Sequence, residues 1–339
     1  PGPDLARIAL VHDIAGVAAV QAKLLRGAGH EVDMIPLPAF GAAWGWPAKG
    51  VAIPIRLAAY LPVVNRLRRR RYDVVHIHWL AQGVIGLLLG RPFFAQAHGS
   101  DLHLNLRNPV YRRVTKSVLD RAKVVFYVTP NLRDYMRGYE AKLRYLPNPV
   151  DVDEIAPNIT PPSRVAKVLI FTRLDPVKGV DQIYPAAAEL SKAVELTALD
   201  WGPLAREYVQ RYRGSVRFVP PVAHAEIGAF LQRFDLVIGQ MKQGILSLME
   251  IEALAAGRPL ITAVDWSLYE DDRPPLVRAS NPEELISAVE DLLSNPQRLA
   301  SLSRDGREWV RRNHSPARHL QVLVSSYFGR AAPDISTAR

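Results

Sequence analysis

Residues 244–261 have the sequence GILSLMEIEALAAGRPLI, and this segment decides the fold that the chain predicts. Ser247, followed three residues later by Glu250, is a capping box, an arrangement that starts a helix by satisfying its first amides. The small and apolar residues that follow predict a helix over 248–256. A glycine and a nearby proline end this helix before a short apolar run at 259–264. The segment therefore predicts a loop, a helix and a strand, which is one unit of an α/β fold.

Short apolar runs alternate with helical patterns on both sides of this segment. In the first half the expected strands are 7–14, 31–37, 73–79, 92–98 and 123–129. In the second half they are 167–174, 195–201, 216–220, 236–240 and 259–264. Strands that alternate with helices form parallel sheets covered on both faces. We therefore predict two α/β domains, each with a Rossmann-like, doubly wound sheet.

The boundary between the two domains is expected at 146–162, which holds five prolines in LPNPVDVDEIAPNITPP. Proline breaks both helices and strands, so this composition is typical of a connection between domains. We predict an N-terminal domain over 1–150, a linker over 151–162 and a C-terminal domain over 163–313. A final amphipathic helix within 314–330 is expected to pack back on the N-terminal domain.

The composition, with 48% hydrophobic and 22% charged residues, is that of an ordinary globular protein. The absence of cysteine excludes disulfides and thiolate chemistry. No apolar run is long enough to cross a bilayer, and the first residues do not resemble a secretory signal. We therefore expect a cytoplasmic protein.

The formal net charge is +10, which attracts anionic partners. Five arginines are concentrated between Arg66 and Arg71. Cations suit the end of a helix, so the run is typical of a solvated helix terminus. The alternative is a contact with anionic lipid at the inner face of a membrane, or with a phosphorylated acceptor. Nucleic acid is not expected as a partner, because the sequence lacks interleaved aromatic residues and known binding motifs.

The loop that precedes the 248–256 helix is a candidate phosphate site. Gly244, Ile245, Leu246 and Ser247 lead into a helix N-terminus, where unpaired amides and the helix dipole favour negative charge. Glu252 lies on another side of the helix, where a carboxylate suits two ribose hydroxyls.

Two cations lie in a second loop, 171–179, with the sequence FTRLDPVKG. Arg173 ends a predicted strand and Lys178 starts the next helix, so both lie where ligands of such sheets bind. Taken alone, Arg173 and Lys178 are most simply interpreted as two surface cations. Together with the first loop, they suit a diphosphate leaving group, because two cations stabilise the negative charge that develops on it.

These two segments together resemble the C-terminal domain of retaining glycosyltransferases of family 4, which have the GT-B fold. The family's G-R-L-x-x-x-K-G-like motif appears as TRLDPVKG at 172–179, and its E-A-x-A-x-G-x-P-x-I motif as EALAAGRPLI at 252–261. The resemblance implies two Rossmann-like domains that face a cleft. It also implies that Arg173 and Lys178 hold the donor diphosphate and that Glu252 holds the ribose.

One position departs from the family pattern. The family has a Glu eight residues before the position of Glu252, and it contacts the donor sugar; Gly244 stands there in this chain. Three alternatives stay open: a neighbour such as Gln243 or Gln240 substitutes, the sugar is held differently, or activity is reduced.

The first half matches the family more weakly. Gly16 follows the first strand, where the family has a glycine-rich loop near the phosphates. His98 and Asp101 follow the strand at 92–98, and the resemblance implies a histidine near the reacting sugar there. Asp101 either orients His98 or the acceptor, or simply caps a turn. His76 and His78 share one face of a strand and are expected to be packed histidines, since no third metal ligand is evident.

The resemblance implies an enzyme that moves a sugar from a nucleoside-diphosphate-sugar to a hydroxyl of a glycan, a lipid-linked acceptor or a small molecule, with retained anomeric configuration. No cofactor or metal is expected, since the acidic triplet Glu270–Asp271–Asp272 lies in a polar loop. Two alternatives remain: a sugar-nucleotide-binding protein with little or no activity, and a sugar-nucleotide epimerase on the same architecture. The sequence of the expected acceptor loop at 38–54, which includes Trp44 and Trp46, does not indicate which acceptor it binds.

Overall fold

The computed structural model describes residues 5–38, 46–103 and 105–329, which form two compact units. Unit 1 comprises Pro1–Asn148 and Pro316–Arg339, and unit 2 comprises Pro149–Ser315. None of the helices in the described ranges combines the length and the apolar character that a bilayer-spanning helix requires.

Unit 1 is built on six strands in the order β2-β1-β3-β4-β5-β6, and every neighbouring pair is parallel. The strands are β1 (Arg7–Val11), β2 (Glu31–Ile35), β3 (Val74–His78), β4 (Phe94–Ala97), β5 (Val124–Tyr127) and β6 (Leu143–Tyr145). The helices are α1 (Val17–Gly27), α2 (Trp46–Arg69), α3 (Val84–Leu89), α4 (Ser100–His103), α5 (Pro109–Arg121) and α14 (Pro316–Phe328). Short 3-10 helices are η1 (Leu80–Gly83), η2 (Asn105–Arg107), η3 (Pro130–Met136) and η4 (Glu140–Lys142).

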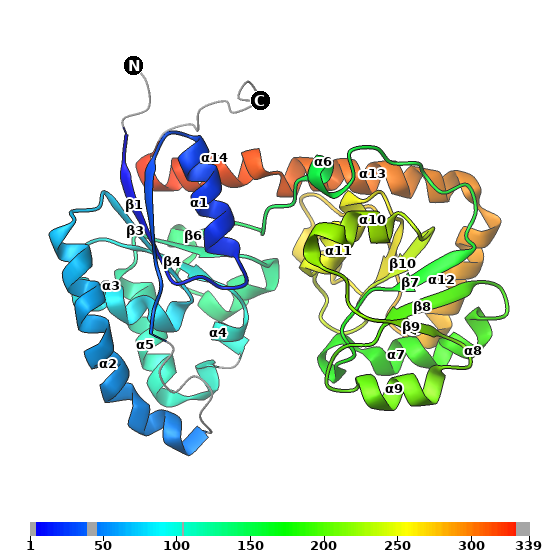
Figure 1. Ribbon diagram of the computed structural model, residues 1–339, viewed down its shortest axis with the longest axis horizontal. Coiled ribbons are helices and arrows are strands. Elements are labelled where there is room, and N and C mark those ends of the chain that lie inside the picture. The colour runs from blue at the N-terminus through cyan, green and yellow to red at the C-terminus, as the bar shows by residue number, and fades with distance from the viewer. Residues whose placement is uncertain (1–4, 39–45, 104, 330–339) are drawn as a thin grey trace. The chain divides into compact units, whose positions relative to one another are not determined.

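Helices cover both faces of this sheet because successive side chains of a strand point to opposite faces. Val74 packs with buried residues of α1 and α14, while Val75 packs with those of α2, α3 and α5. In Figure 1 the blue helix α1 and the red helix α14 accordingly lie side by side, although they come from opposite ends of the chain.

Unit 2 also has six strands, in the different order β12-β11-β10-β7-β8-β9, and every neighbouring pair is again parallel. The strands are β7 (Lys167–Ile170), β8 (Glu195–Leu199), β9 (Arg217–Val219), β10 (Leu236–Ile238), β11 (Leu260–Thr262) and β12 (Val277–Arg278). The helices are α6 (Val152–Ile155), α7 (Val180–Ile183), α8 (Ala187–Leu190), α9 (Ala205–Tyr212), α10 (Ile227–Leu231), α11 (Leu248–Ala255), α12 (Pro282–Ser294) and α13 (Pro296–His314). Short 3-10 helices are η5 (Pro176–Lys178), η6 (Tyr184–Ala186), η7 (His224–Glu226) and η8 (Trp266–Tyr269).

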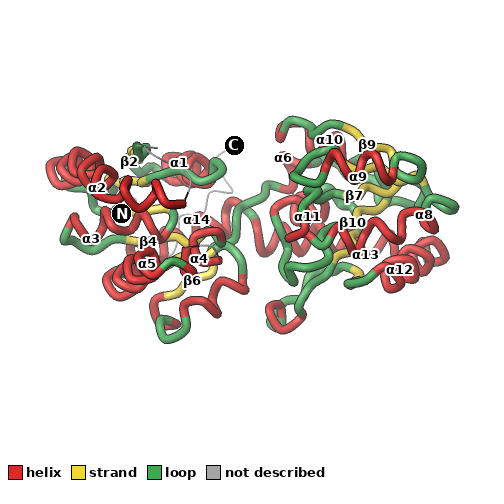
Figure 2. The backbone as a smooth tube through the Cα atoms, turned by 90° about the horizontal axis from the view of Figure 1, so that it is seen from below, coloured by secondary structure: helices red, strands yellow, loops and turns green. Residues whose placement is uncertain are grey.

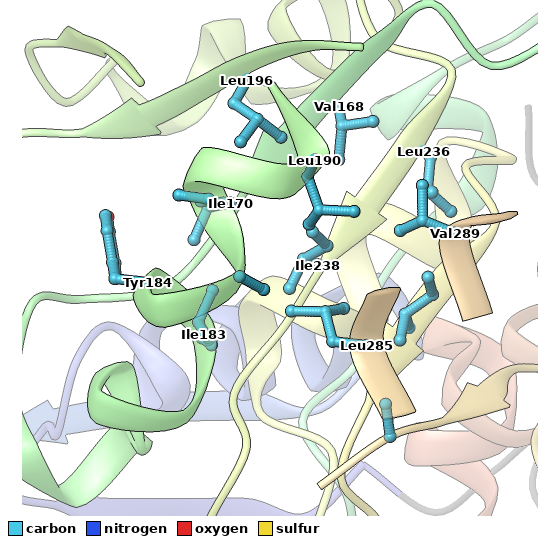
Figure 3. Packing of buried hydrophobic residues seen from close by; sticks show 14 of the residues in the cluster. Val168, Ile170, Ile183, Tyr184, Leu190, Leu196, Leu236, Ile238, Leu285 and Val289 are labelled. Atoms are coloured by element: carbon cyan, nitrogen blue, oxygen red, sulfur yellow. The ribbon is translucent and has the colours of Figure 1, made fainter. Parts of the chain in front are cut away.

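The core of unit 2 also has two layers. Val168 and Ile170 of β7 pack in one cluster with residues of α7, α8 and α12, and Figure 3 shows Val168 beside Leu190. Leu169, between them in sequence, packs on the other face with residues of α10, α11 and α13. Figure 2 shows the red helices that enclose the yellow strands in each unit.

The predicted pair of parallel, doubly wound sheets is confirmed. The segment 151–162, expected as a linker, instead packs on unit 2: it contains α6, Val152 is buried, and Arg307 Nη1 donates to the Val152 carbonyl over 2.8 Å. Trp44 lies outside the described residues, and only the backbone of Trp46 is described, as the start of α2.

The order of the strands fixes where each unit can bind a ligand. In unit 1 the chain runs from β1 to β2 on one side and then crosses to β3 on the other; in unit 2 it runs from β7 to β8 and β9 and then crosses to β10. Ligands of such sheets bind at the carboxyl ends of the strands where the order reverses. These switch points are β1/β3 in unit 1 and β7/β10 in unit 2.

Candidate functional site

Two loops meet at the switch point of unit 2, namely 171–179 after β7 and 239–247 after β10. The Met241 amide donates to the Lys178 carbonyl over 2.9 Å. Gly179 has φ 69° and lies so close that a Cβ there would be 2.9 Å from the Met241 carbonyl carbon. Only glycine permits this approach, so the two loops form one surface.

Lys178 lies at the centre of this surface. Its Nζ donates to Gln243 Oε1 over 2.6 Å, and the side chain is half-buried. Burial lowers the pKa of Lys178, opposed mainly by the nearby Glu250 carboxylate. A desolvated, fixed ammonium at a strand end interacts strongly with an anion.

Arg173 lies at the same strand end, as the sequence predicts. Its Nη2 pairs with Asp175 Oδ2 at 2.5 Å, and its guanidinium carbon lies 6.0 Å from the centre of the Trp201 ring. The side chain is 44% exposed, so the guanidinium is accessible to a ligand while two neighbours hold it.

Gln240 organises the second loop, a role that sequence reasoning missed. Its Nε2 donates to the carbonyls of Ile245 and Ala263, and its Oε1 accepts from the amides of Lys242 and Gln243. Because all its hydrogen-bonding capacity is used, Gln240 is not available to replace the carboxylate missing at Gly244.

Glu250 is the second organiser. The buried carboxylate accepts from the Gln240 amide (2.8 Å), from Thr262 Oγ1 (2.8 Å) and from the Ser247 amide (2.6 Å). The capping box of Ser247 and Glu250 is confirmed. The Leu246 amide likewise donates to the Tyr269 hydroxyl over 2.9 Å. Two of the four amides expected to contact phosphate, those of Leu246 and Ser247, are therefore already engaged inside the unit.

Glu252 is buried, unlike an ordinary helix-surface charge. Its side chain is 3% exposed and its Oε1 lies 3.0 Å from His224 Nε2, whose side chain is 76% exposed. Burial raises the pKa of Glu252, and His224 opposes that shift. His224 lies on η7, far from Glu252 in the sequence, so no local pattern pointed to this pair.

Gly244 borders a cavity of about 420 Å³ whose lining includes Asp265, Trp266, Arg278 and Ser280. A Cβ at Gly244 would lie 3.4 Å from the Asp265 Cβ. Asp265 is thus a carboxylate beside the position where the sequence lacks one. Hydrogen bonds from Ser267 lower its pKa.

His98 and Asp101 lie at the carboxyl end of β4 in unit 1. Asp101 is fully buried and accepts from the amides of Leu80, His98 and Gly99 at 2.9–3.0 Å. Burial raises its pKa, and these amides oppose the shift. Asp101 therefore caps the turn and positions the backbone of His98.

The His98 ring continues into a buried polar cluster. His98 Nε2 lies 3.2 Å from His78 Nδ1, the His78 ring stacks on His76 at 4.6 Å, and His76 Nδ1 contacts the Tyr327 hydroxyl at 2.6 Å. Burial lowers the pKa of His98 to about 4 and that of His76 to about 3. These imidazoles are neutral near pH 7. No group of three metal-ligating side chains is found in the described ranges.

The loop after β1 contains Gly16 in the left-handed region, with φ 79°, just before α1. The non-glycine residues His12, Ala15 and Trp79 also have positive φ, of 68°, 51° and 70°. Such conformations cost roughly 1–3 kcal/mol each and concentrate at functional sites. They were not expected from the sequence, which carries no local signal of backbone strain.

The arginines at the end of α2 have mixed surroundings. Arg70 and Arg66 face Asp33 at 2.9 and 4.0 Å, and Arg68 donates to the Leu88 carbonyl over 2.7 Å. Arg69 and Arg71 are exposed. Part of the cluster therefore belongs to the packing of unit 1.

Two family models match the chain. The model of Glycosyltransferase Family 4 matches residues 17–154, and a model described as Glycosyl transferase-like matches residues 185–325. A GDP-mannose-dependent alpha-(1-6)-phosphatidylinositol monomannoside mannosyltransferase of Mycolicibacterium smegmatis is 26% identical over 289 residues, which are 73% of this chain and 75% of that protein.

Solved structures show the same fold at lower identity. Sucrose-phosphate synthase from Thermosynechococcus elongatus has a TM-score of 0.72 at 18% identity, over 94% of this chain and 96% of that one. Anabaena Alr3699/HepE in complex with UDP has a TM-score of 0.72 at 14% identity, over 96% and 100%. The two parallel sheets with their helices match the GT-B fold.

Proposed function

Because the chain belongs to glycosyltransferase family 4, we propose that it transfers a sugar from a nucleoside-diphosphate-sugar to an acceptor hydroxyl with retained anomeric configuration. The observation that carries this proposal is the pair of cations at the β7/β10 switch point. Lys178 is held by Gln243 and Arg173 by Asp175, both at the carboxyl end of β7. The relative that uses GDP-mannose makes GDP-mannose the first donor to test.

Arg173 and Lys178 hold the donor diphosphate and stabilise the negative charge that develops as the sugar departs. The loop at Gly244 and Ile245 approaches the phosphates from the other side. Since two fixed cations neutralise the diphosphate, the proposal includes no metal.

Glu252 binds the ribose hydroxyls of the donor. An ionised carboxylate accepts two hydrogen bonds from neighbouring hydroxyls, and its contact with His224 orients it. The burial that raises its pKa also makes these hydrogen bonds stronger than they would be in water.

Unit 1 binds the acceptor. His98 contacts the reacting groups as a neutral imidazole, which can donate through one nitrogen and accept through the other. Asp101 is a positioning residue that acts through the His98 amide.

The test compares Lys178→Ala with Lys167→Ala, a matched variant at the opposite, amino end of the same strand, where the lysine is exposed. We expect Lys178→Ala to lower the transfer rate roughly 10²–10³-fold, the usual effect of removing one group that stabilises developing charge. Lys167→Ala should leave the rate unchanged. Transfer is followed with GDP-mannose and UDP-glucose and a panel of hydroxyl acceptors; full activity of Lys178→Ala would overturn the assignment.

A second candidate is a protein that binds the sugar nucleotide without transferring the sugar, and Gly244 is the observation that favours it. In the same assay, tight donor binding without turnover against every acceptor would support this candidate. Free nucleoside diphosphate with unmodified acceptor would instead indicate an epimerase.

An anionic membrane surface is a further proposed partner, through the exposed Arg69 and Arg71. Replacing both by Ser should weaken the affinity for phosphatidylglycerol vesicles, measured by co-sedimentation, roughly 30-fold, since each basic residue near such a surface contributes about 1 kcal/mol. Equal co-sedimentation of both proteins would contradict the proposal.

A further inference from the structure

Two aromatic side chains meet at the switch point of unit 1. His12 follows β1 and Trp79 follows β3, and these strands are neighbours in the sheet. Their ring centres are 6.2 Å apart and their planes are inclined by 42°, so the rings form a shallow angle. Both side chains are half-buried, which leaves part of each accessible.

The backbone holds both residues in conformations that their side chains disfavour. His12 has φ 68°, and Trp79 has φ 70° with ψ 113°. Each is fixed by a backbone hydrogen bond, from the His12 amide to the Ile35 carbonyl and from the Trp79 amide to the Gln96 carbonyl, both 2.9 Å. Glycine, which has no Cβ, tolerates positive φ better than either residue, so the rings themselves are the reason to look for a function here.

Trp79 is not explained as a core residue. It is absent from the hydrophobic residues that pack in the two core clusters of unit 1. Buried indole N–H groups usually have a partner, yet Trp79 Nε1 has none among the described residues.

The surroundings of the two rings are polar and hold no nearby cation among the described residues that would attract a phosphate; the closest charge is the Asp13 carboxylate, which opposes the lowering of the His12 pKa. His12 lies close enough to His98 that its charge would lower the pKa of His98, and burial lowers the pKa of His12 itself. Asp13 is engaged at the start of α1, where its Oδ1 accepts from the Ala18 amide over 2.9 Å. Neutral imidazoles exchange hydrogen bonds with hydroxyl groups, whereas a phosphate would require cations.

We propose that His12 and Trp79 form an aromatic platform that binds the apolar face of a ring-shaped neutral polyol, a sugar or a cyclitol, as the acceptor. The face of an aromatic ring carries negative charge density, which attracts the C–H groups on one face of such a polyol. The proposal rests on the proposed transferase activity, since it names the class of acceptor.

The test uses the indole N–H signals of the full-length protein labelled with ¹⁵N-tryptophan. Trp79→Phe and Trp201→Phe variants assign the two relevant signals, and Trp201 reports on the donor site because Arg173 lies over its ring. The probes are myo-inositol and methyl α-D-mannopyranoside, with glycerol as an acyclic polyol and with GDP and UDP as nucleotides.

We expect the Trp79 signal to shift saturably with at least one cyclic polyol and not with glycerol or the nucleotides. An unmoved Trp79 signal with both cyclic polyols, or an equal shift with glycerol, would overturn the platform. If the Trp79 signal responds as expected but the Trp201 signal ignores both nucleotides, the platform stands and the proposed donor site fails.

Trp79→Gly separates recognition from stability. Glycine removes the ring and tolerates the positive φ, so we expect a folded protein with at least tenfold weaker binding of the cyclic polyol, measured by saturation-transfer difference. Retained affinity in a folded Trp79→Gly protein would contradict the proposal.

Discussion

The two switch points lie in parallel, doubly wound sheets of the same kind and differ in chemistry. At β7/β10 in unit 2, Arg173 and Lys178 place positive charge at the strand ends. At β1/β3 in unit 1, the corresponding position is occupied by aromatic rings and by imidazoles that burial keeps neutral. The difference indicates that the fold determines where a ligand binds, while the residues after the strands determine its charge.

The backbones differ in the same way. The described residues of unit 2 that have positive φ are all glycines, among them Gly179 and Gly244, whereas unit 1 includes His12, Ala15 and Trp79. Glycine lets the backbone approach a ligand closely, which suits binding by amides. A strained non-glycine residue instead presents its side chain, which suits recognition of a ring.

The largest effect is expected from substitutions of the two carboxylates of α11. They test whether Glu250 supports the structure of the unit 2 site while Glu252 binds the ligand. We expect Glu250→Gln to lower the free energy of unfolding by about 3 kcal/mol, because an amide cannot accept all three hydrogen bonds and leaves buried donors unpaired. Glu252→Gln should leave that free energy unchanged or raise it, since it removes a buried charge whose pKa is already raised. Urea unfolding of the two variants measures both effects.

The same two variants should differ in the opposite way in their affinity for the nucleotide, with the larger loss at Glu252. Glu252→Gln is expected to weaken nucleoside diphosphate binding roughly tenfold in a fully folded protein, through the loss of charge-assisted hydrogen bonds to ribose. Calorimetry with GDP and UDP measures the affinity. If both substitutions lowered the free energy of unfolding equally and left equal affinities for the nucleotide, the separate roles assigned to Glu250 and Glu252 would be contradicted.

Much of the fold was predictable because its signals are local. The capping box of Ser247 and Glu250 lies within four residues, and the apolar strands stand out as short runs. The helix α13 was missed because its buried stripe includes Ser303 and Arg307, so hydrophobic periodicity does not reveal it. The end of α2 was anticipated as a helix terminus in the arginine run, but its earlier part was missed because it contains prolines, which normally argue against a helix.

The candidate site was predictable only where a motif is contiguous. Arg173 and Lys178 lie in one loop and were found together. The partner of Glu252, His224, comes from another element and becomes visible only when the sheet brings the loops together. The strain at Trp79 depends on φ and ψ, which the sequence does not state.

Acid provides a smaller effect that should act more strongly on unit 1 than on unit 2. His98 and His76, with pKa values lowered to about 4 and about 3, are neutral in the folded state, whereas an unfolded histidine titrates near 6.5. Between these values the unfolded chain binds more protons, so the stability of unit 1 is complete above about pH 6.5 and falls as the pH drops toward 4. The slope is up to about 1.4 kcal/mol per pH unit for each histidine.

The contribution of Glu252 to the pH dependence of stability has the opposite sign. Its raised carboxyl pKa makes the folded state bind the proton more readily than the unfolded state. Acidification from pH 7 to 5 should therefore reduce hydrogen-exchange protection, corrected for intrinsic rates, in β3 and β4 more than in β7 and β10. His98→Gln should reduce the loss in unit 1, whereas His224→Gln, a substitution at an exposed histidine of unit 2, should not. If acid reduced hydrogen-exchange protection equally in both units, the buried neutral histidines would not be the feature that distinguishes the two switch points.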